Sequence, residues 1–376
     1  MKYKKIFFCF ILFFLGTNIF VFGQFLKDIT AQQMATEATE YIYSFDFKNA
    51  KISIDKLNKR LPNHPVVPFL YAYLMSWQTF PLQKNYGEYT QYEKYLQTCL
   101  AQSKEIIKKN KQDIEGNYFA MMSYSLMAMH ESEAGNFWAS VELGKSAFYY
   151  LKKGFDWGEK LADYYFTTGL YRYYAIQYPE THASARVAMI FFPNGDKIQG
   201  LKYLQLASTQ SKFSKIEAFI YLHGIYSKYE KNYLNALAQT QNLIQKYPYN
   251  PFFALKHCES LIFVGRYAEA ELLLPRFASL SGRMYRVATN TFKGLIYEKY
   301  YKNNTTAQTF YKNSVDIANA DVRYSKDFQA QSYIGLGRIA LANGQKEQAK
   351  KYFKKAEKMT EYEGLKDEIK QYLKKL

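Results

Sequence analysis

Two short stretches of the sequence contain residue types that could carry out chemistry. Gly144-Lys-Ser has the lysine and hydroxyl of a phosphate-binding loop, and His130-Glu-Ser-Glu begins like a zinc-protease helix. The phosphate loop needs a further glycine five residues earlier, where Ala139 stands, and a strand before it. The second histidine of the zinc helix is also missing. Neither stretch predicts an enzyme active site.

The histidines suggest one further arrangement. His223 and His257 lie 34 residues apart, at the same place in two neighbouring repeats, so stacking of the repeats could bring them together as a metal or pH-sensitive pair. No carboxylate or cysteine completes a ligand set at matching spacing, which favours two packing residues instead. We therefore expect no catalytic residue, no metal and no cofactor in this chain.

A helical pattern around His223 and His257 repeats toward the C-terminal end of the chain. An alanine followed by a bulky residue and an apolar residue recurs in steps of 34, 37 and 42 residues, at Ala236, Ala270, Ala307 and Ala349. A small residue usually precedes each alanine, at Gly224, Cys258, Gly294 and Gly337. Near Ala349 the apolar residues have the i, i+4, i+7 spacing of one helical face. Pairs of stacked helices explain this period.

This pattern resembles the tetratricopeptide repeat family over residues 217–363, and more loosely over 31–64. The resemblance implies an all-α, right-handed superhelical solenoid of antiparallel helix pairs. The sequence divides into a leader (1–23), an irregular helical-repeat region (24–210), tetratricopeptide-like repeats (211–363) and a capping helix (364–376). In a solenoid each repeat contacts only its neighbours.

The resemblance also implies where a partner binds. In this family, fixed positions of each first helix face the inner groove, and an extended or helical peptide held by apolar anchors suits such a surface. The alternative is that part of this surface packs against the N-terminal half. Carried onto this sequence, those positions include Tyr221, Lys228, Tyr229, Phe252, Glu259, Phe263 and Arg338.

The first 23 residues have the pattern of an export signal. Three lysines precede an apolar run from Ile6 to Phe22, and Val21-Phe-Gly23 provides small residues for cleavage, leaving Gln24 as the new N-terminus. An uncleaved anchor is the alternative, although 17 apolar residues are few for a membrane span. We expect export to the periplasm or cell envelope, with no transmembrane segment after cleavage.

Charge and composition narrow the partner classes. Loss of the leader lowers the formal net charge from +17 to +14, and the basic residues are spread along the chain, which favours a solvated surface over nucleic-acid binding. Peripheral envelope association remains compatible with this charge. Cys99 and Cys258 lie in distant units without metal spacing, so both are expected to be buried packing residues.

These observations favour an exported, non-enzymatic scaffold that binds a protein or peptide. The 37 tyrosines and 29 phenylalanines allow an alternative, an aromatic-rich module that binds carbohydrate or another small ligand, although most aromatic residues at helical spacing belong to a core. The scaffold hypothesis predicts loss of a protein partner on joint replacement of Tyr221 and Phe252. The carbohydrate hypothesis predicts loss of a sugar on Tyr229→Ala.

Overall fold

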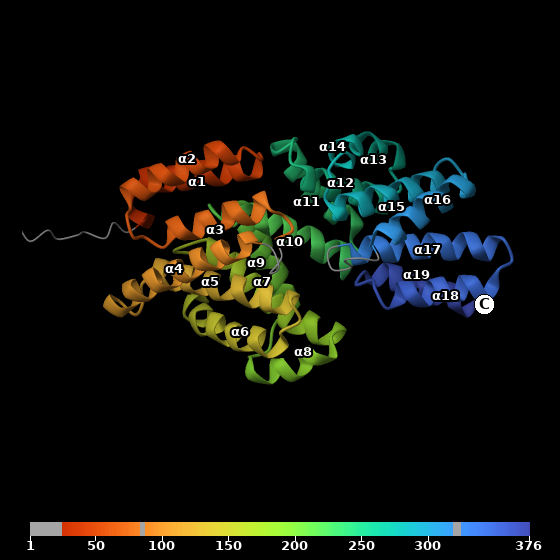
Figure 1. Cartoon of the computed structure of the whole chain (residues 1–376). Helices are drawn as coiled ribbons and strands as arrows, with labels where there is room; N and C mark the ends of the chain where they lie inside the picture. The colour runs from red at the N-terminus through yellow and green to blue at the C-terminus, as the bar shows by residue number, and fades with distance from the viewer. Residues whose placement is uncertain (1–24, 83–86, 319–324) are drawn as a thin grey trace, which may run out of the picture.

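A computed structural model describes residues 25–82, 87–318 and 325–376, and within these ranges it is built from α-helices and short 3-10 helices (Figure 1). The predicted leader and its cleavage site lie outside the described residues. The helices of the first half are α1 (Ile29–Tyr43), α2 (Phe47–Arg60), α3 (Val66–Gln78), α4 (Gly87–Lys109), α5 (Ile114–Glu133), α6 (Phe137–Leu151), α7 (Asp163–Thr181), α8 (Ala183–Ala188) and α9 (Lys197–Gln210).

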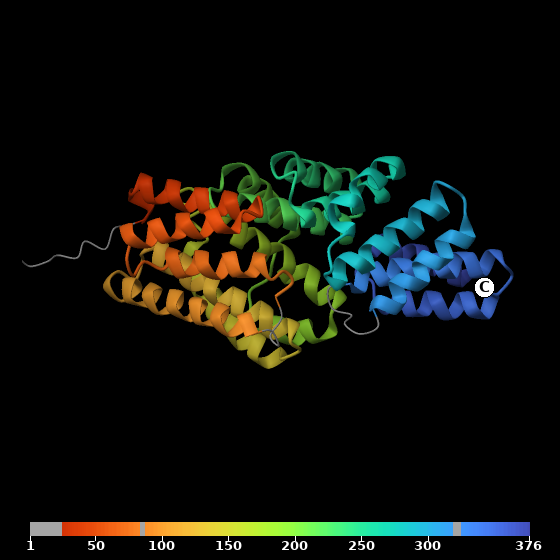
Figure 2. The same cartoon turned by 45° about the horizontal axis from the view of Figure 1, so that its top comes forward.

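The second half contains α10 (Lys215–Lys228), α11 (Tyr233–Lys246), α12 (Pro251–Phe263), α13 (Tyr267–Leu273), α14 (Pro275–Ala278), α15 (Arg283–Lys299), α16 (Asn304–Ala318), α17 (Lys326–Ala342), α18 (Lys346–Glu357) and α19 (Glu363–Lys374). Successive helices pack as antiparallel pairs, and the last pairs extend away from the first half (Figure 2). The fold is the expected all-α solenoid of helix pairs.

Short polar residues and glycines set the helix ends. A side-chain oxygen accepts a hydrogen bond from a backbone N–H of the first turn, which would otherwise lack a partner, at Asp28, Asp46, Asp113, Asp196, Asn232 and Asn250. Gly344 joins α17 to α18 with φ at 76°, a left-handed conformation that favours glycine. The local sequence therefore specifies where each pair turns.

The repeated second helices bury the face that the sequence predicts. The repeat alanine and the residues four and seven positions later are buried in every unit, so a mainly apolar stripe in each unit contributes to the core. Cys258 occupies a glycine position and is fully buried, as expected. These stripes are Ala236, Thr240 and Leu243; Ala270, Leu274 and Phe277; Ala307, Tyr311 and Ser314; Ala349, Phe353 and Ala356.

One expectation about the solenoid is wrong: its units do not contact only their neighbours. The Asn250 Nδ2 donates to the backbone carbonyl of Tyr43 at 2.9 Å, and the Tyr247 hydroxyl donates to Glu40 at 2.8 Å. α1 and α3 therefore lie beside α10, α11 and α12 (Figure 1). One superhelical turn, from α1 to α12, is therefore tight enough for its first and last helices to meet. The apolar surfaces of these helices are buried where they meet.

Candidate functional site

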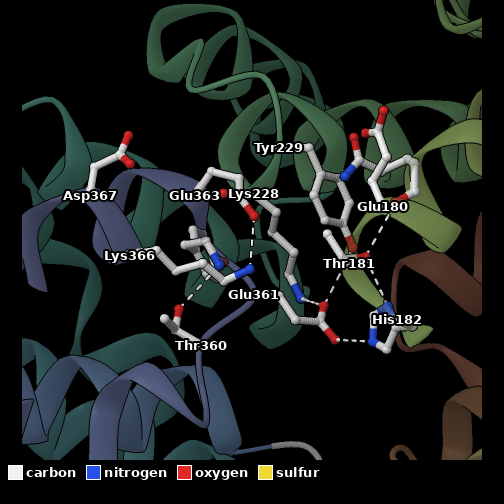
Figure 3. A network of polar contacts seen from close by, with 12 residues as sticks. Glu180, Thr181, His182, Lys228, Tyr229, Thr360, Glu361, Glu363, Lys366 and Asp367 are labelled. Carbon is white, nitrogen blue, oxygen red and sulfur yellow. Dashed lines mark hydrogen bonds and ion pairs between the residues drawn. The ribbon is translucent and has the colours of Figure 1, made fainter. Parts of the chain in front are cut away.

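Four of the predicted groove residues lie together and contact one segment of the chain itself. Lys228, at the end of α10, forms ion pairs with Asp327 at 2.8 Å and with Glu361 at 3.1 Å. Burial alone would lower the pKa of Lys228, but these two carboxylates outweigh it and raise the pKa. The Tyr229 hydroxyl lies 3.5 Å from the same Glu361 carboxylate (Figure 3).

Tyr362, the next residue of that segment, inserts between two other predicted groove residues. Its hydroxyl donates to Glu259 Oε1 at 2.9 Å, and its ring stacks on Phe263 with centroids 5.2 Å apart. Tyr362 is fully buried, and the Lys228 ammonium lies 5.5 Å from the centre of its ring. The groove surface of α10 and α12 thus already contains a peptide segment with an acidic and an aromatic side chain.

Arg338 contacts the same C-terminal segment further along. Its guanidinium donates two hydrogen bonds to Glu298, at 2.6 and 2.7 Å, and one to Glu368 of α19 at 2.8 Å. The Tyr311 hydroxyl also donates to Glu298, at 2.6 Å. Burial raises the pKa of Glu298, but the hydrogen bonds and charge of Arg338 reverse the direction, so the pKa is lowered and the carboxylate stays ionised. The predicted capping helix therefore lies against the groove.

The remaining two predicted groove residues face the N-terminal half. The Phe252 ring packs against Phe80, with centroids 4.9 Å apart, and against Trp77 at 5.9 Å. Tyr221 packs against Phe166 of α7 and lines a cavity described below. The structure thus separates the seven predicted residues into two groups, and partner binding by any of them stays a prediction.

A second contact ties the C-terminal segment to the end of α7. The His182 imidazole lies 3.9 Å from Glu361 Oε1, and the Thr181 hydroxyl is 2.8 Å from the other ring nitrogen (Figure 3). Glu361 therefore bridges α7 and α10. His182 and Glu361 are separated by most of the second half of the chain, so this contact brings the C-terminal segment beside the end of α7.

An apolar cavity of about 530 Å³ lies inside the turn formed by the first half. Its walls come from α1, α3, α5, α6, α7 and α10, together with residues of the 3-10 helices at Phe25–Lys27 and Met189–Phe191. The phenylalanines, methionines and leucines of the wall include Phe69, Phe119, Met122, Phe148, Phe166 and Leu170. The volume is in the range of small-molecule sites, roughly 300–1,000 Å³.

One carboxyl group, that of Glu217, belongs to the cavity wall. The hydroxyls of Tyr43 and Tyr73 donate to its Oε1, and its buried Oε2 has no hydrogen-bond partner among the described residues. Burial raises the pKa of Glu217 from its ordinary value, although the two tyrosine hydroxyls oppose the shift. The protonated carboxyl is therefore favoured more than in an exposed glutamate.

Sequence reasoning missed Glu217, Tyr43 and Tyr73. Glu217 lies in the first turn of a repeat helix. An acidic residue there normally faces solvent and interacts favourably with the positive end of the helix dipole. Its partners lie 174 and 144 residues away in the chain. No local pattern indicates this contact, because it arises only when the ends of the superhelical turn meet.

The motif residues and histidines considered in the sequence analysis contact other side chains of the fold. Gly144-Lys-Ser lies within α6, and Lys145 pairs with Glu142 at 2.8 Å. Burial lowers the pKa of His257 to about 4, and its Nδ1 lies 2.9 Å from the Thr240 hydroxyl. Burial also lowers the pKa of His223. Within the described ranges, no group of three potential metal ligands occurs.

Comparisons with known proteins add only remote similarities of fold. No known family description matches the chain, and no curated protein matches it in sequence. Among solved structures, yeast Tom70 aligns with a TM-score of 0.39 and 12% identity, covering 92% of this chain and 87% of that one. The human IFIT1 dimer with PPP-AAAA aligns with a TM-score of 0.32 and 11% identity, covering 87% and 93%. Neither alignment is close enough to transfer a ligand or a role.

The described helices also bear on membrane insertion. Among residues 25–82, 87–318 and 325–376, none of the helices combines the length and apolar character of a membrane span.

Proposed function

We propose that this chain is an exported, non-enzymatic helical-repeat scaffold of the cell envelope, in the periplasm, that binds a protein partner through the groove of α10 and α12. Export is supported by the leader pattern of residues 1–23 and its cleavage site after Gly23. The observation that supports groove binding is that Glu361 and Tyr362 of the chain itself occupy it. The partner would present a similar acidic and aromatic segment.

This proposal makes the C-terminal segment a competitor of the partner. Charge complementarity comes from Lys228, and specificity for an aromatic ring comes from Phe263 and Glu259. A ligand binds more weakly when its site is filled in most molecules, since only the open fraction is competent. Removal of Tyr362 from the groove should therefore strengthen binding of the partner.

The test combines crosslinking in intact cells with affinity purification of the mature chain. We expect one dominant protein partner, recovered more strongly with Tyr362→Ala and lost with Lys228→Met combined with Phe263→Ala. Lys231→Met is the matched control, because Lys231 also pairs with the C-terminal segment, at Asp367, but is half-exposed and lies outside the aromatic contact. Recovery that is insensitive to Lys228 and Phe263 would contradict the proposed groove.

A labelled peptide with the sequence of residues 360–368 tests the same groove directly. It should bind Tyr362→Ala protein in a saturable manner and bind the wild-type protein much more weakly. Equal binding to both proteins, or binding that survives Lys228→Met, would show that the groove does not select such segments.

The alternative, a module that binds a small ligand, is favoured by one observation, the apolar cavity of the first half. The carbohydrate form of this alternative has less support. The Tyr229 ring packs near Tyr173 and Tyr174, with centroids 6.4 and 6.2 Å away, and its hydroxyl approaches Glu361. An aromatic ring that stacks on a sugar needs an open face, and Tyr229 uses its surroundings for packing instead.

A further inference from the structure

The cavity inside the first half is distinct from the groove. Its wall is formed by the inner faces of α1, α3, α5, α6, α7 and α10, whereas the groove contacts involve the C-terminal ends of α10 and α12. Lys228 and Phe263 do not line the cavity. A ligand in the cavity and a peptide in the groove would therefore use different side chains.

The chemistry of the wall excludes most polar ligands. No lysine, arginine or histidine is among the described residues that line the cavity, so a phosphate or an ionised carboxylate would be buried without a cation. Sugars and nucleotides carry many hydrogen-bonding groups, whereas the described wall offers hydroxyl groups and one carboxyl group, and some of these hydroxyls are already paired. The Tyr118 hydroxyl is paired with Ser214 at 2.9 Å, and that of Tyr171 with the carbonyl of Pro193 at 2.6 Å.

The only carboxyl group among the described wall residues has unused hydrogen-bonding capacity. The hydroxyls of Tyr43 and Tyr73 occupy Oε1 of Glu217, so the proton of the neutral carboxyl belongs on Oε2, which has no partner in the described structure. A buried donor without an acceptor is costly. Oε2 itself has less than 1 Å² of accessible surface, so a ligand oxygen, such as that of an alcohol or a ketone, would remove this cost once the Glu217 side chain turns toward the cavity.

The cavity reaches the surface where apolar side chains are exposed. Met129 and Tyr178 line the cavity and are also 38% and 41% exposed. Met189, another wall residue, is followed by Ile190, which is 80% exposed, and Val187 of α8 is 50% exposed. Contiguous exposed apolar patches often mark binding sites. An apolar molecule could enter here from a membrane or a carrier.

We propose that this cavity binds a lipid-like molecule that has a long or polycyclic apolar body and one neutral, oxygen-bearing head group placed beside Glu217. Each CH₂ group buried against the wall adds to the affinity. The carboxyl of Glu217 fixes the orientation of the ligand, and the apolar walls of α5, α6 and α7 supply most of the affinity. Binding does not depend on the groove.

The test uses the full mature chain and displacement of a neutral fluorescent probe by hexadecan-1-ol and by hexadecane. We expect saturable displacement by both, with the alcohol binding more tightly. Ala147→Phe, which places a ring in the cavity from α6, should abolish displacement by both ligands. Met122→Trp, on α5, provides a second filling variant should the first not fold.

The head-group position is tested by Glu217→Leu. This variant should weaken alcohol binding about tenfold, equivalent to 1.4 kcal/mol, and leave alkane binding unchanged. Alcohol binding that withstands both filling variants would overturn the proposed site, and an unchanged preference for the alcohol in Glu217→Leu would overturn the role of Glu217. A preference for hexadecylamine or hexadecanoate at pH 8 over the alcohol would overturn the neutral head group.

The source of the ligand is resolved by mass spectrometry. Organic extracts of the wild-type protein purified from its native host should contain a neutral lipid, and extracts of Ala147→Phe should lack it. If the purified wild-type cavity is empty but takes up hexadecan-1-ol from vesicles, the ligand is loaded from membranes. A failure here leaves the crosslinking result at Lys228 unaffected, so the two proposals can fail separately.

Discussion

Gly224 and Gly337 occupy the same position in two repeats, yet the structure predicts opposite effects of alanine there. An added Cβ at Gly337 would lie 2.6, 2.8 and 2.9 Å from three atoms of the Phe353 ring. At Gly224 nothing lies within 4 Å of the added atom. Both glycines lie within helices, α17 and α10, so the substitution changes helix propensity equally at both positions.

The two contributions set the expected magnitudes. Alanine in place of glycine inside a helix stabilises by about 1 kcal/mol. Gly224→Ala should show this gain. At Gly337 the overpacking term, typically about 1–3 kcal/mol, opposes it, and the buried Phe353 ring cannot move into solvent. Three contacts below 3.0 Å place the cost near the upper end, so Gly337→Ala should destabilise its helix pair by about 1–2 kcal/mol.

The assay must report on local stability, because repeat arrays unfold in parts and a single transition does not describe them. Amide hydrogen exchange followed by mass spectrometry resolves α17 and α18. In Gly337→Ala their exchange should be about 5–30-fold faster, as expected for 1–2 kcal/mol. In Gly224→Ala exchange of α10 should slow. Equal or slower exchange of α17 in Gly337→Ala would refute the packing argument.

Three further predictions concern buried polar groups and thiols. Arg338→Ala leaves the buried Glu298 carboxylate with only the partly exposed Lys299, at 3.2 Å, and should cost about 3 kcal/mol in urea unfolding of the last repeats; a loss below 1 kcal/mol would contradict the pairing. Because the pKa of Glu217 is raised in the folded state, the contribution of Glu217 to the free energy of unfolding is greatest below pH 4.5 and falls as pH rises through the folded-state pKa. Glu217→Gln should flatten this fall in thermal melts, and an unchanged pH profile would contradict the raised pKa. Burial raises the pKa of the Cys99 thiol to about 12 and also raises the pKa of the Cys258 thiol. Neither thiol should therefore react with a disulfide reagent before the protein unfolds, and rapid labelling at pH 8 would contradict their burial.

The sequence predicted the repeated elements because their causes are local. Helix pairs follow from the apolar spacing around Ala349, and the turn follows from Gly344. Only the structure distinguishes Gly337, where an added Cβ would meet the Phe353 ring, from Gly224, which has no close neighbour. A glycine that is needed for packing and one that is merely tolerated look alike in a sequence.

The groove residues show the limit of reasoning by repeat position. The family pattern places Lys228 and Arg338 on the first helices facing inward, and there they contact other parts of the chain. Which segment occupies that face depends on where α19 returns, and no local pattern states this. The seven residues therefore form two separate groups instead of one continuous surface.

The sequence by itself determined the helix pairs, their turns and the apolar stripe that each second helix buries, because these depend on residues within a few turns of one another. Only the tertiary structure decided that the first superhelical turn closes on itself. The contacts of Tyr43 with Glu217 and of Glu361 with Lys228 join residues more than 130 positions apart. They depend on small rotations between successive pairs that accumulate along the chain, and this accumulation creates both the cavity and the occupied groove.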